Sequence, residues 1–222
     1  MIEQYLGITG DQMAAAAGQT IYMLFWGLLF GSLFGIPLGI LLTITRKGGI
    51  LQNKVVYALL NYTINIVRSV PYIILLVALM PLTKAIVGTR IGTKAALVSL
   101  VFYITPFLAR LIEGSLLEVN KGIIEAAEAM GASPVQVIRH FLLPEAMGSL
   151  ILSLTTGTIG LLGATAMAGA IGGGGVGNLA LTYGYQQFNT PLMVTTVIVL
   201  IVFVQLIQEL GNYFSKRVRT RK

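Results

Sequence analysis

Residues 12–45, QMAAAAGQTIYMLFWGLLFGSLFGIPLGILLTIT, decide the fold, because this stretch contains no charged residue. Within it, residues 18–44 form an apolar run long enough to cross the hydrocarbon core of a bilayer as one helix. Arg46 and Lys47 end the run. The stretch therefore predicts a transmembrane helix rather than the core of a soluble domain.

The composition of the whole chain agrees with a membrane protein. Of its 222 residues, 55% are hydrophobic and 10% are charged, whereas soluble domains have about 25% charged residues. Cysteine is absent, which excludes disulfides, thiol nucleophiles and Cys-ligated metal sites. The net charge of +7 comes mostly from Lys and Arg at the ends of apolar runs, so we expect no nucleic-acid partner. No basic region precedes the first run, so we expect no cleavable signal peptide.

Five apolar runs predict an all-α integral membrane protein with five transmembrane helices. The expected spans are residues 18–44, 57–80, 91–116, 145–170 and 191–214. The expected parts are an extracytoplasmic N-terminal segment (1–17), a transmembrane domain (18–214) and a basic cytosolic tail (215–222). No internal repeat is visible, which argues against the inverted-repeat secondary transporters.

The distribution of Lys and Arg predicts the orientation. With five spans, 10 of these residues fall on the side that holds the C-terminus and 3 fall on the other side. Because cytosolic loops are enriched in Lys and Arg, we expect the C-terminus in the cytosol and the N-terminus outside. The expected location is the inner or plasma membrane of a prokaryotic cell. The segment between spans three and four then lies in the cytosol.

This cytosolic segment, residues 121–143, has the pattern of two capped helices joined by a turn. Gly131 can adopt the left-handed conformation that ends a helix. Ser133 is a suitable N-cap, and Gln136 completes a capping box with it. Pro144 either stops the second helix or lies in the first turn of the next one. The alternative is an ordinary amphipathic helix at the membrane surface.

The same segment resembles the EAA loop of ATP-binding-cassette (ABC) importer permeases. The residues that match in type and spacing are Glu125, Ala126, Ala127, Gly131, Leu143 and Pro144. Phe141 stands where an aliphatic residue is usual in that family. In the family this loop is the coupling helix-turn-helix that docks into a groove of a cytosolic ATPase. The resemblance therefore implies that these six residues couple the permease to ATP hydrolysis.

Further stretches resemble the permeases of methionine-uptake importers, namely residues 65–76, 87–92, 105–110 and 166–177. The likeness covers nearly the whole chain. It implies a permease subunit that forms the pathway for methionine, of the L form or of both forms. The implied partners are a second copy of this chain, two cytosolic ATPases that bind ATP and Mg²⁺, and an extracytoplasmic substrate-binding protein, often lipid-anchored.

The sequence predicts no catalytic or cofactor site in this chain. The glycine-rich residues 172–177 lack the Lys-Ser/Thr pair of a phosphate-binding loop, and we expect them to form a flexible outer loop or a broken helix end. No acid–base pair is visible, so any ATP hydrolysis must occur on another chain. The single histidine, His140, has no cluster of ligands around it, so we expect no metal site.

Span four contains the candidate residues for the pathway. Its small residues can let helices pack closely within one subunit, or they can line a conduit between two copies of the chain. Both interpretations remain open at this stage. The candidate lining residues are Thr156, Gly160, Gly163 and Met167.

Arg68 is the candidate charge inside the membrane. If span two begins near Tyr57, Arg68 lies inside the bundle and needs a partner such as Glu113 or a carbonyl group. If residues 54–67 lie along the inner interface, Arg68 extends its charge to that interface. Arg110 and Glu113 are three residues apart and can pair with each other.

Two alternatives to methionine import follow from the same residues. An importer permease for another amino acid or small solute would share the coupling segment. An ATP-independent secondary transporter or channel would need coupling carboxylates within the membrane, and only Glu113 and Glu209 come near the middle of a span. A membrane scaffold without transport would leave the capped cytosolic hairpin unexplained.

Overall fold

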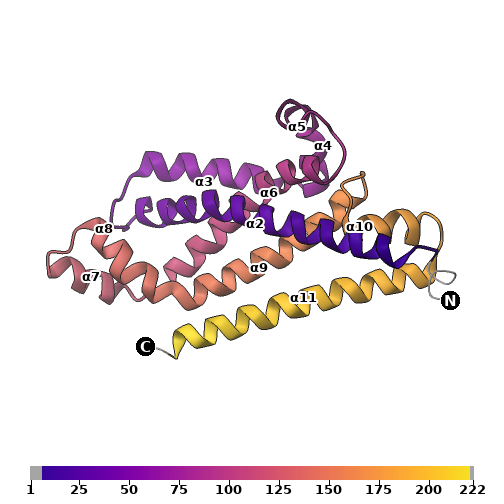
Figure 1. Ribbon diagram of the computed structural model, residues 1–222. Coiled ribbons are helices and arrows are strands. Elements are labelled where there is room, and N and C mark those ends of the chain that lie inside the picture. Colours follow the sequence, from indigo (N-terminus) through magenta and orange to yellow (C-terminus); the bar gives the residue numbers. More distant parts are fainter. Residues whose placement is uncertain (1–6, 221–222) are drawn as a thin grey trace. The chain divides into compact units, whose positions relative to one another are not determined.

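The computed structural model describes residues 7–220, and the regular elements in that range are all helices (Figure 1). The long helices are α2 (Gly10–Thr45), α6 (Thr93–Leu117), α9 (Leu143–Gly169) and α11 (Thr190–Arg219). The shorter elements, of which η1 and η2 are π-helices, are α3 (Lys54–Ser69), α4 (Tyr72–Ala78), α5 (Met80–Val87), α7 (Lys121–Ala129), α8 (Pro134–Gln136), η1 (Val137–Leu142), α10 (Gly175–Asn178) and η2 (Leu179–Tyr185). The expected all-α class is confirmed.

Helices long and apolar enough to cross a bilayer match four of the expected spans. They are α2, α6, the continuous helix Pro134–Gly169 and α11. The pair α3 and α4 meets the same criteria when it counts as one broken span, so the described residues hold up to five spans.

The first helix begins earlier than expected, at Gly10 instead of residue 18. Thr9 and Gln12 form a capping box, in which the Gln12 N–H donates to Thr9 Oγ1 at 3.2 Å and the Thr9 N–H donates to Gln12 Oε1 at 3.0 Å. Asp11 adds a negative charge in the first turn, where the helix dipole favours it. These polar signals start the helix ahead of its apolar run.

The second span is not the single helix that we expected over residues 57–80. The helix α3 ends at Ser69, and α4 begins at Tyr72. Pro71 lacks an N–H and disfavours helical geometry at Val70, so the backbone breaks there. A further helix, α5, follows and ends at Gly88, whose φ is 82°. The expected continuous helix was wrong because proline geometry prevails over the apolar run.

The described helices divide into two compact units. Unit 1 contains the residues up to Gly31 together with 70–104 and 158–207, and unit 2 contains 32–69, 105–157 and 208–220. Each long helix contributes one part to each unit. Unit 2 carries the predicted coupling segment, the Arg68 region and most of the charged residues discussed below.

In unit 2, the helices α2 and α6 meet backbone to backbone. A Cβ atom at Gly35 would lie 2.9 Å from the Thr105 carbonyl oxygen, and one at Gly39 would lie 2.7 Å from the Ala109 carbonyl oxygen. Small residues allow such close packing between membrane helices, where dispersion contacts replace the hydrophobic effect. Beside this contact, Leu42, Ile64 and Ala109 form a buried cluster.

The glycine-rich residues 172–177 lie in unit 1, where they are packed against other helices. The expected flexible loop was therefore wrong, and the structure shows the other alternative, a broken helix end. Gly175, Val176 and Gly177 are buried and begin α10. Gln19 Oε1 accepts a hydrogen bond from the Gly175 N–H at 2.7 Å, and Thr20 Oγ1 accepts one from the Val176 N–H at 2.9 Å. A Cβ atom at Gly177 would overlap the backbone of Ala166. Glycine is therefore needed for α10 to lie against α9.

The contact between α2 and α6 predicts a difference between two glycine substitutions. Gly39→Ala places a methyl group against Ala109 and Ile112 and should lower the free energy of unfolding by about 1–3 kcal/mol. Gly114→Ala, in α6, meets no atom within 4 Å and should leave it unchanged or raise it by up to about 1 kcal/mol. Thermal unfolding in detergent compares the two variants. Equal midpoints would contradict the proposed close contact.

Candidate functional site

The predicted coupling segment begins with α7, which is capped at both ends. Asn120 accepts a hydrogen bond from the Gly122 N–H at 2.8 Å through its side-chain oxygen. At the other end, the Gly131 N–H donates to the Glu128 carbonyl at 2.9 Å and the Ala132 N–H donates to the Ala127 carbonyl at 3.1 Å. These two bonds define a Schellman motif. Gly131 has a φ of 81°, which confirms the predicted left-handed conformation.

The second half of the segment also begins as predicted. Ser133 and Gln136 form the capping box, and the Ser133 N–H donates to Gln136 Oε1 at 2.7 Å. Pro134 occupies the first helical position. Both predicted caps are therefore present in the structure.

The helix that starts at Pro134 does not stop at Pro144. It continues through η1 into α9 and ends at Gly169. In η1 the Leu143 N–H donates to the Ile138 carbonyl five residues back. This wider π-helical turn accommodates Pro144, which has no N–H to donate. Of the two alternatives for Pro144, the position in the first turn of α9 is the one observed. The second helix of the hairpin is thus the beginning of span four.

The predicted coupling residues lie on both faces of this hairpin. Ala127 is fully buried, so only a small side chain fits there. Glu125, Ala126, Gly131 and Pro144 are exposed, and Leu143 is half-buried. The exposed residues therefore form the surface that another protein can contact.

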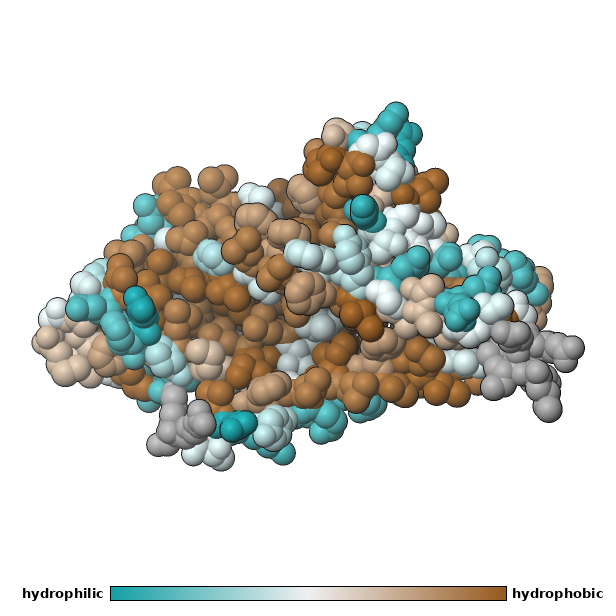
Figure 2. Space-filling model, viewed as in Figure 1, coloured by the Kyte–Doolittle hydropathy of each residue, from teal (hydrophilic) through white to brown (hydrophobic). Residues whose placement is uncertain are grey.

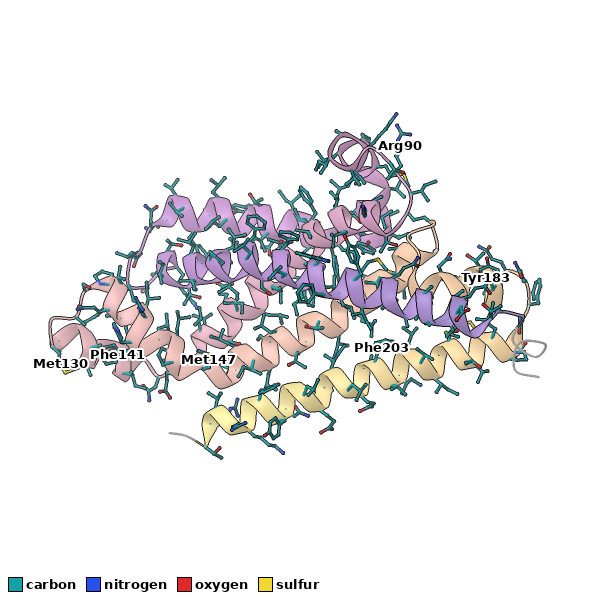
Figure 3. The ribbon with its side chains drawn as sticks, viewed as in Figure 1. Arg90, Met130, Phe141, Met147, Tyr183 and Phe203 are labelled. Carbon is teal, nitrogen blue, oxygen red and sulfur yellow. The ribbon has the colours of Figure 1, made fainter. Side chains whose placement is uncertain are left out.

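Two further exposed residues were missed by the sequence analysis. Met130 is 72% exposed and Val135 is 70% exposed, on either side of the turn at Gly131. Figure 3 shows Met130 at the tip of the hairpin. Their signal in the sequence is the placement of apolar residues beside a glycine turn in a polar segment. Large apolar side chains exposed in this way are typical of interaction surfaces.

A cavity of about 680 Å³ lies beside α7 in unit 2. Its charged lining residues are Arg46, Lys47, Lys121, Glu125 and Glu128. No salt bridge is found among these five side chains within residues 7–220. The charged groups next to Glu125 are thus available to a partner.

The four candidate pathway residues follow one another along α9 at intervals of four, three and four. Thr156 and Gly163 are exposed, Gly160 is half-buried and Met167 is half-exposed. A Cβ atom at Gly163 would meet no atom within 4 Å. By contrast, Ala164 and Ala168 are buried. The small residues of span four therefore serve internal packing on one face and leave another face of α9 open.

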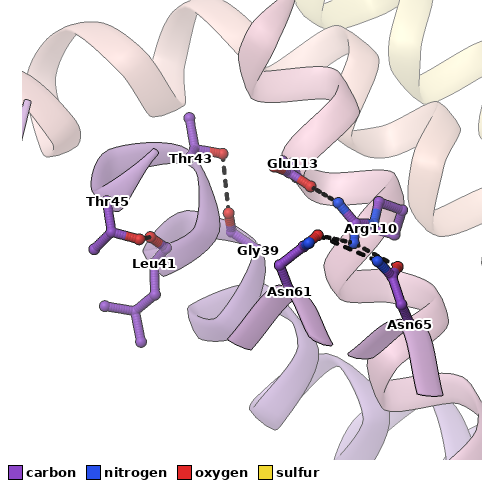
Figure 4. A network of polar contacts seen from close by, with 8 residues as sticks. All are labelled: Gly39, Leu41, Thr43, Thr45, Asn61, Asn65, Arg110 and Glu113. Carbon is purple, nitrogen blue, oxygen red and sulfur yellow. Dashed lines mark hydrogen bonds and ion pairs between the residues drawn. The ribbon is translucent and has the colours of Figure 1, made fainter. Parts of the chain in front are cut away.

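A polar network joins α3 to α6 in unit 2 (Figure 4). Arg110 Nη1 lies 2.6 Å from Glu113 Oε2, and Arg110 Nη2 donates to Asn61 Oδ1 and to Asn65 Oδ1, both at 2.8 Å. The Glu113 side chain is 5% exposed. The structure thus shows the alternative in which Arg110 and Glu113 pair with each other. The two asparagines were missed by the sequence analysis.

Arg68 has a different neighbour from the one considered in the sequence. Its guanidinium carbon lies 5.9 Å from the centroid of the Phe107 ring, within the range of a cation–π interaction. The residue is exposed, and Glu113 is engaged by Arg110 instead.

The chain was compared with known proteins. It matches the family model of the binding-protein-dependent transport system inner membrane component over residues 35–220. The probable D-methionine transport system permease protein MetI of Vibrio cholerae is 46% identical over 99% of this chain and 98% of its own length. The methionine import system permease protein MetP of Bacillus subtilis is 41% identical over 100% of both chains.

Solved structures agree with these relatives. A chain from inward-facing conformations of the MetNI methionine ABC transporter has a TM-score of 0.91 and 42% identity, and the match covers 95% of this chain and 99% of that chain. A chain of an amino acid ABC transporter with histidines has a TM-score of 0.77 at 18% identity over 93% of this chain and 94% of that chain, which shows a shared fold. Because the family model covers most of its length and its relatives match from end to end, this chain belongs to the family of inner membrane components of binding-protein-dependent transport systems.

Proposed function

We propose that this chain is the permease subunit of an ABC importer and that two copies of it form the transmembrane pathway for methionine. The observation that carries this proposal is identity of 41% to 46% with methionine permeases over at least 99% of the chain. The capped hairpin adds independent support, because a rigid polar segment between two spans provides a surface for a soluble partner.

ATP hydrolysis takes place, in this proposal, on two cytosolic ATPase subunits, with ATP and Mg²⁺ bound there. An extracytoplasmic binding protein delivers the cargo. A nucleotide site at the glycine-rich stretch is disfavoured, because the N–H groups of Gly175 and Val176 already bind Gln19 and Thr20. These N–H groups are not available to phosphate oxygens.

The ATPase contacts the hairpin in the proposed complex. The contact surface on the hairpin consists of the exposed residues of the EAA pattern together with the neighbouring Met130 and Val135, so it has both polar and apolar parts. Ala127 and the Schellman motif at Gly131 hold this surface in one shape. Glu125 supplies a carboxylate that lines the charged cavity and can pair with a cation of the partner.

The proposed coupling role predicts that Gly131→Val and Glu125→Lys weaken ATPase binding and abolish methionine uptake while the chain still inserts into the membrane. Valine at a positive φ costs about 1–2 kcal/mol, so the turn must change shape. Gly88→Val is the matched control, because Gly88 has a φ of 82° and no atom within 4 Å of its Cβ position. Co-purification with the ATPase measures the effect. Wild-type uptake in both hairpin variants would remove the coupling assignment.

We also propose the orientation with the N-terminus outside and the C-terminus in the cytosol, with parts 1–17, 18–214 and 215–222 as expected from the sequence. Because the chain lacks cysteine, single cysteines can report each side. Asp11→Cys should be labelled from outside and Lys216→Cys from inside, since both residues are exposed. A cysteine at Ser215, the first residue of the basic tail, would not suit labelling, because Ser215 is buried and its hydroxyl donates to the Gly148 carbonyl at 2.9 Å. Labelling of both cysteines from one side would contradict the five-span topology.

The open face of α9 lines the proposed pathway, with Thr156, Gly160, Gly163 and Met167 as its members. An apolar lining suits methionine, since a thioether is only a weak hydrogen-bond acceptor. Gly163→Leu should reduce methionine uptake several-fold without reducing assembly with the ATPase, because nothing within one subunit opposes the added Cβ. Gly114→Leu, equally open at its Cβ, is the control. Equal uptake in both variants would exclude this face as the lining.

The cargo itself is tested by uptake of radiolabelled methionine in cells that lack other methionine systems, with a panel of amino acids as competitors. Methionine should compete best. A polar amino acid that competes best would favour the alternative of an importer for another cargo. An ATP-independent transporter is disfavoured, because of the two candidate coupling carboxylates Glu113 is already bound by Arg110, which leaves Glu209 alone.

A further inference from the structure

We propose that Arg68 binds the carboxylate of the amino-acid cargo as it passes through the membrane. This inference rests on the proposed import of an amino acid. It assigns a chemical role to a residue for which no acidic partner is found among residues 7–220. Four properties of Arg68 carry the argument: its depth, its uncompensated charge, the face of α3 on which it lies, and its aromatic neighbour.

The depth follows from α6. Phe107 is the fifteenth of the 25 residues of this helix. At about 1.5 Å per residue, Phe107 lies about 21 Å from one end and about 15 Å from the other. The apolar core of a bilayer is about 30 Å thick, so Phe107 lies near its middle. The guanidinium of Arg68, 5.9 Å from the Phe107 ring, shares that depth. An arginine held at this depth does not reach the interface, which disfavours the alternative of an interfacial side chain.

The charge of Arg68 is not compensated by an acidic side chain in residues 7–220. The ion pair recorded there is Arg110–Glu113. The polar region between α3 and α6 thus contains two arginines and one carboxylate, which leaves one positive charge. Such a charge is costly in lipid and is stable only beside water or an anion. One excess positive charge matches one carboxylate.

The position of Arg68 on α3 separates it from the lipid-facing residues. Val55, Leu59, Tyr62 and Ile66 form an apolar stripe that is 66% to 77% exposed, and Figure 2 shows hydrophobic side chains over α3. Arg68 instead follows Asn61 and Asn65 at intervals of four and three residues. The two stripes are about a third of a turn apart. Lipid can therefore contact one face of α3, whereas the polar stripe faces α6 through Asn61 and Asn65. Arg68, at the end of this stripe, remains exposed and can contact an aqueous pathway.

The chemistry of the side chain suits the proposed ligand. A guanidinium presents two parallel N–H groups to a carboxylate, which lysine does not. The Phe107 ring lies beside the guanidinium and restricts its orientation without consuming its hydrogen-bond donors. Every amino acid carries a carboxylate, so Arg68 would anchor the cargo while apolar residues of the pathway accept the side chain.

The first experiment tests whether Arg68 faces water. Arg68→Cys and Ile66→Cys are made in the full complex, and each introduces the sole cysteine of this chain. A water-soluble thiol reagent should modify Cys at position 68 and leave position 66, on the apolar stripe, unmodified. The inference is overturned if position 66 reacts and position 68 does not.

The second experiment tests the requirement for a positive charge. Arg68→Gln should reduce methionine uptake about tenfold or more, because a hydrogen-bonded charge is lost. Arg68→Lys should retain several-fold more uptake than Arg68→Gln. In Arg68→Cys, 2-aminoethyl methanethiosulfonate should restore uptake by adding an ammonium group, whereas the 2-sulfonatoethyl reagent should not. Arg90→Gln, an exposed arginine in unit 1, is the control and should leave uptake unchanged.

Uptake by Arg68→Gln within twofold of wild type, or equal recovery with both reagents, would overturn the proposal. Co-purification with the ATPase distinguishes a loss of transport from a loss of assembly. If the Arg68→Cys variant does not assemble with the ATPase, methionine uptake by Arg68→Lys and Arg68→Gln decides the question. The proposed cargo can fail separately. If the wild-type complex imports a different amino acid, the same variants are tested with that amino acid, whose carboxylate should still require Arg68.

Discussion

The bond between Arg110 and Glu113 is the interaction on which the membrane part of unit 2 depends. It neutralises two charges in an apolar environment, and the remaining donors of Arg110 bind Asn61 and Asn65 on α3. Loss of either charged partner would leave the other unpaired, which is far more costly in lipid than in water. The network thereby fixes α3 along α6 and places Arg68 beside Phe107.

The proposed coupling to an ATPase depends on where the chain is continuous and where it turns. The helix Pro134–Gly169 has no break, so in the proposed orientation a displacement at its cytosolic beginning would be carried along its axis to the open face of α9. The turn at Gly131 separates this helix from α7. The surface of α7 can therefore suit a protein partner while the long helix suits the membrane. Such rigid-body transmission is a common route from a ligand-driven motion to a change in access.

The sequence predicted the elements whose signals are local. The apolar runs predicted four of the spans, Gly131 predicted the helix end, and Ser133 with Gln136 predicted the capping box. The missed features depend on residues far apart in the chain. Nothing near Gly175 indicates that Gln19 binds its N–H, and nothing near Arg110 indicates the amides of Asn61 and Asn65. The break at Pro71 was visible, but the apolar run around it favoured a single span. The π-helical turn before Pro144 was missed because a shifted hydrogen-bond register leaves no pattern of residue types.

The two arginines between α3 and α6 show how burial separates a structural charge from a charge suited to transport. Arg110 is joined to a carboxylate whose side chain is 5% exposed, and such a pair persists because breaking it would leave that buried charge without a partner. Arg68 is exposed, and its recorded contact is with an aromatic ring. A bond between an exposed guanidinium and a carboxylate is weak because water competes for both groups. Weak binding is what a pathway requires, since a tightly held cargo would not leave. A permanent acidic partner for Arg68 would occupy the guanidinium, so the absence of such a partner among residues 7–220 is consistent with a binding group whose anion arrives and departs.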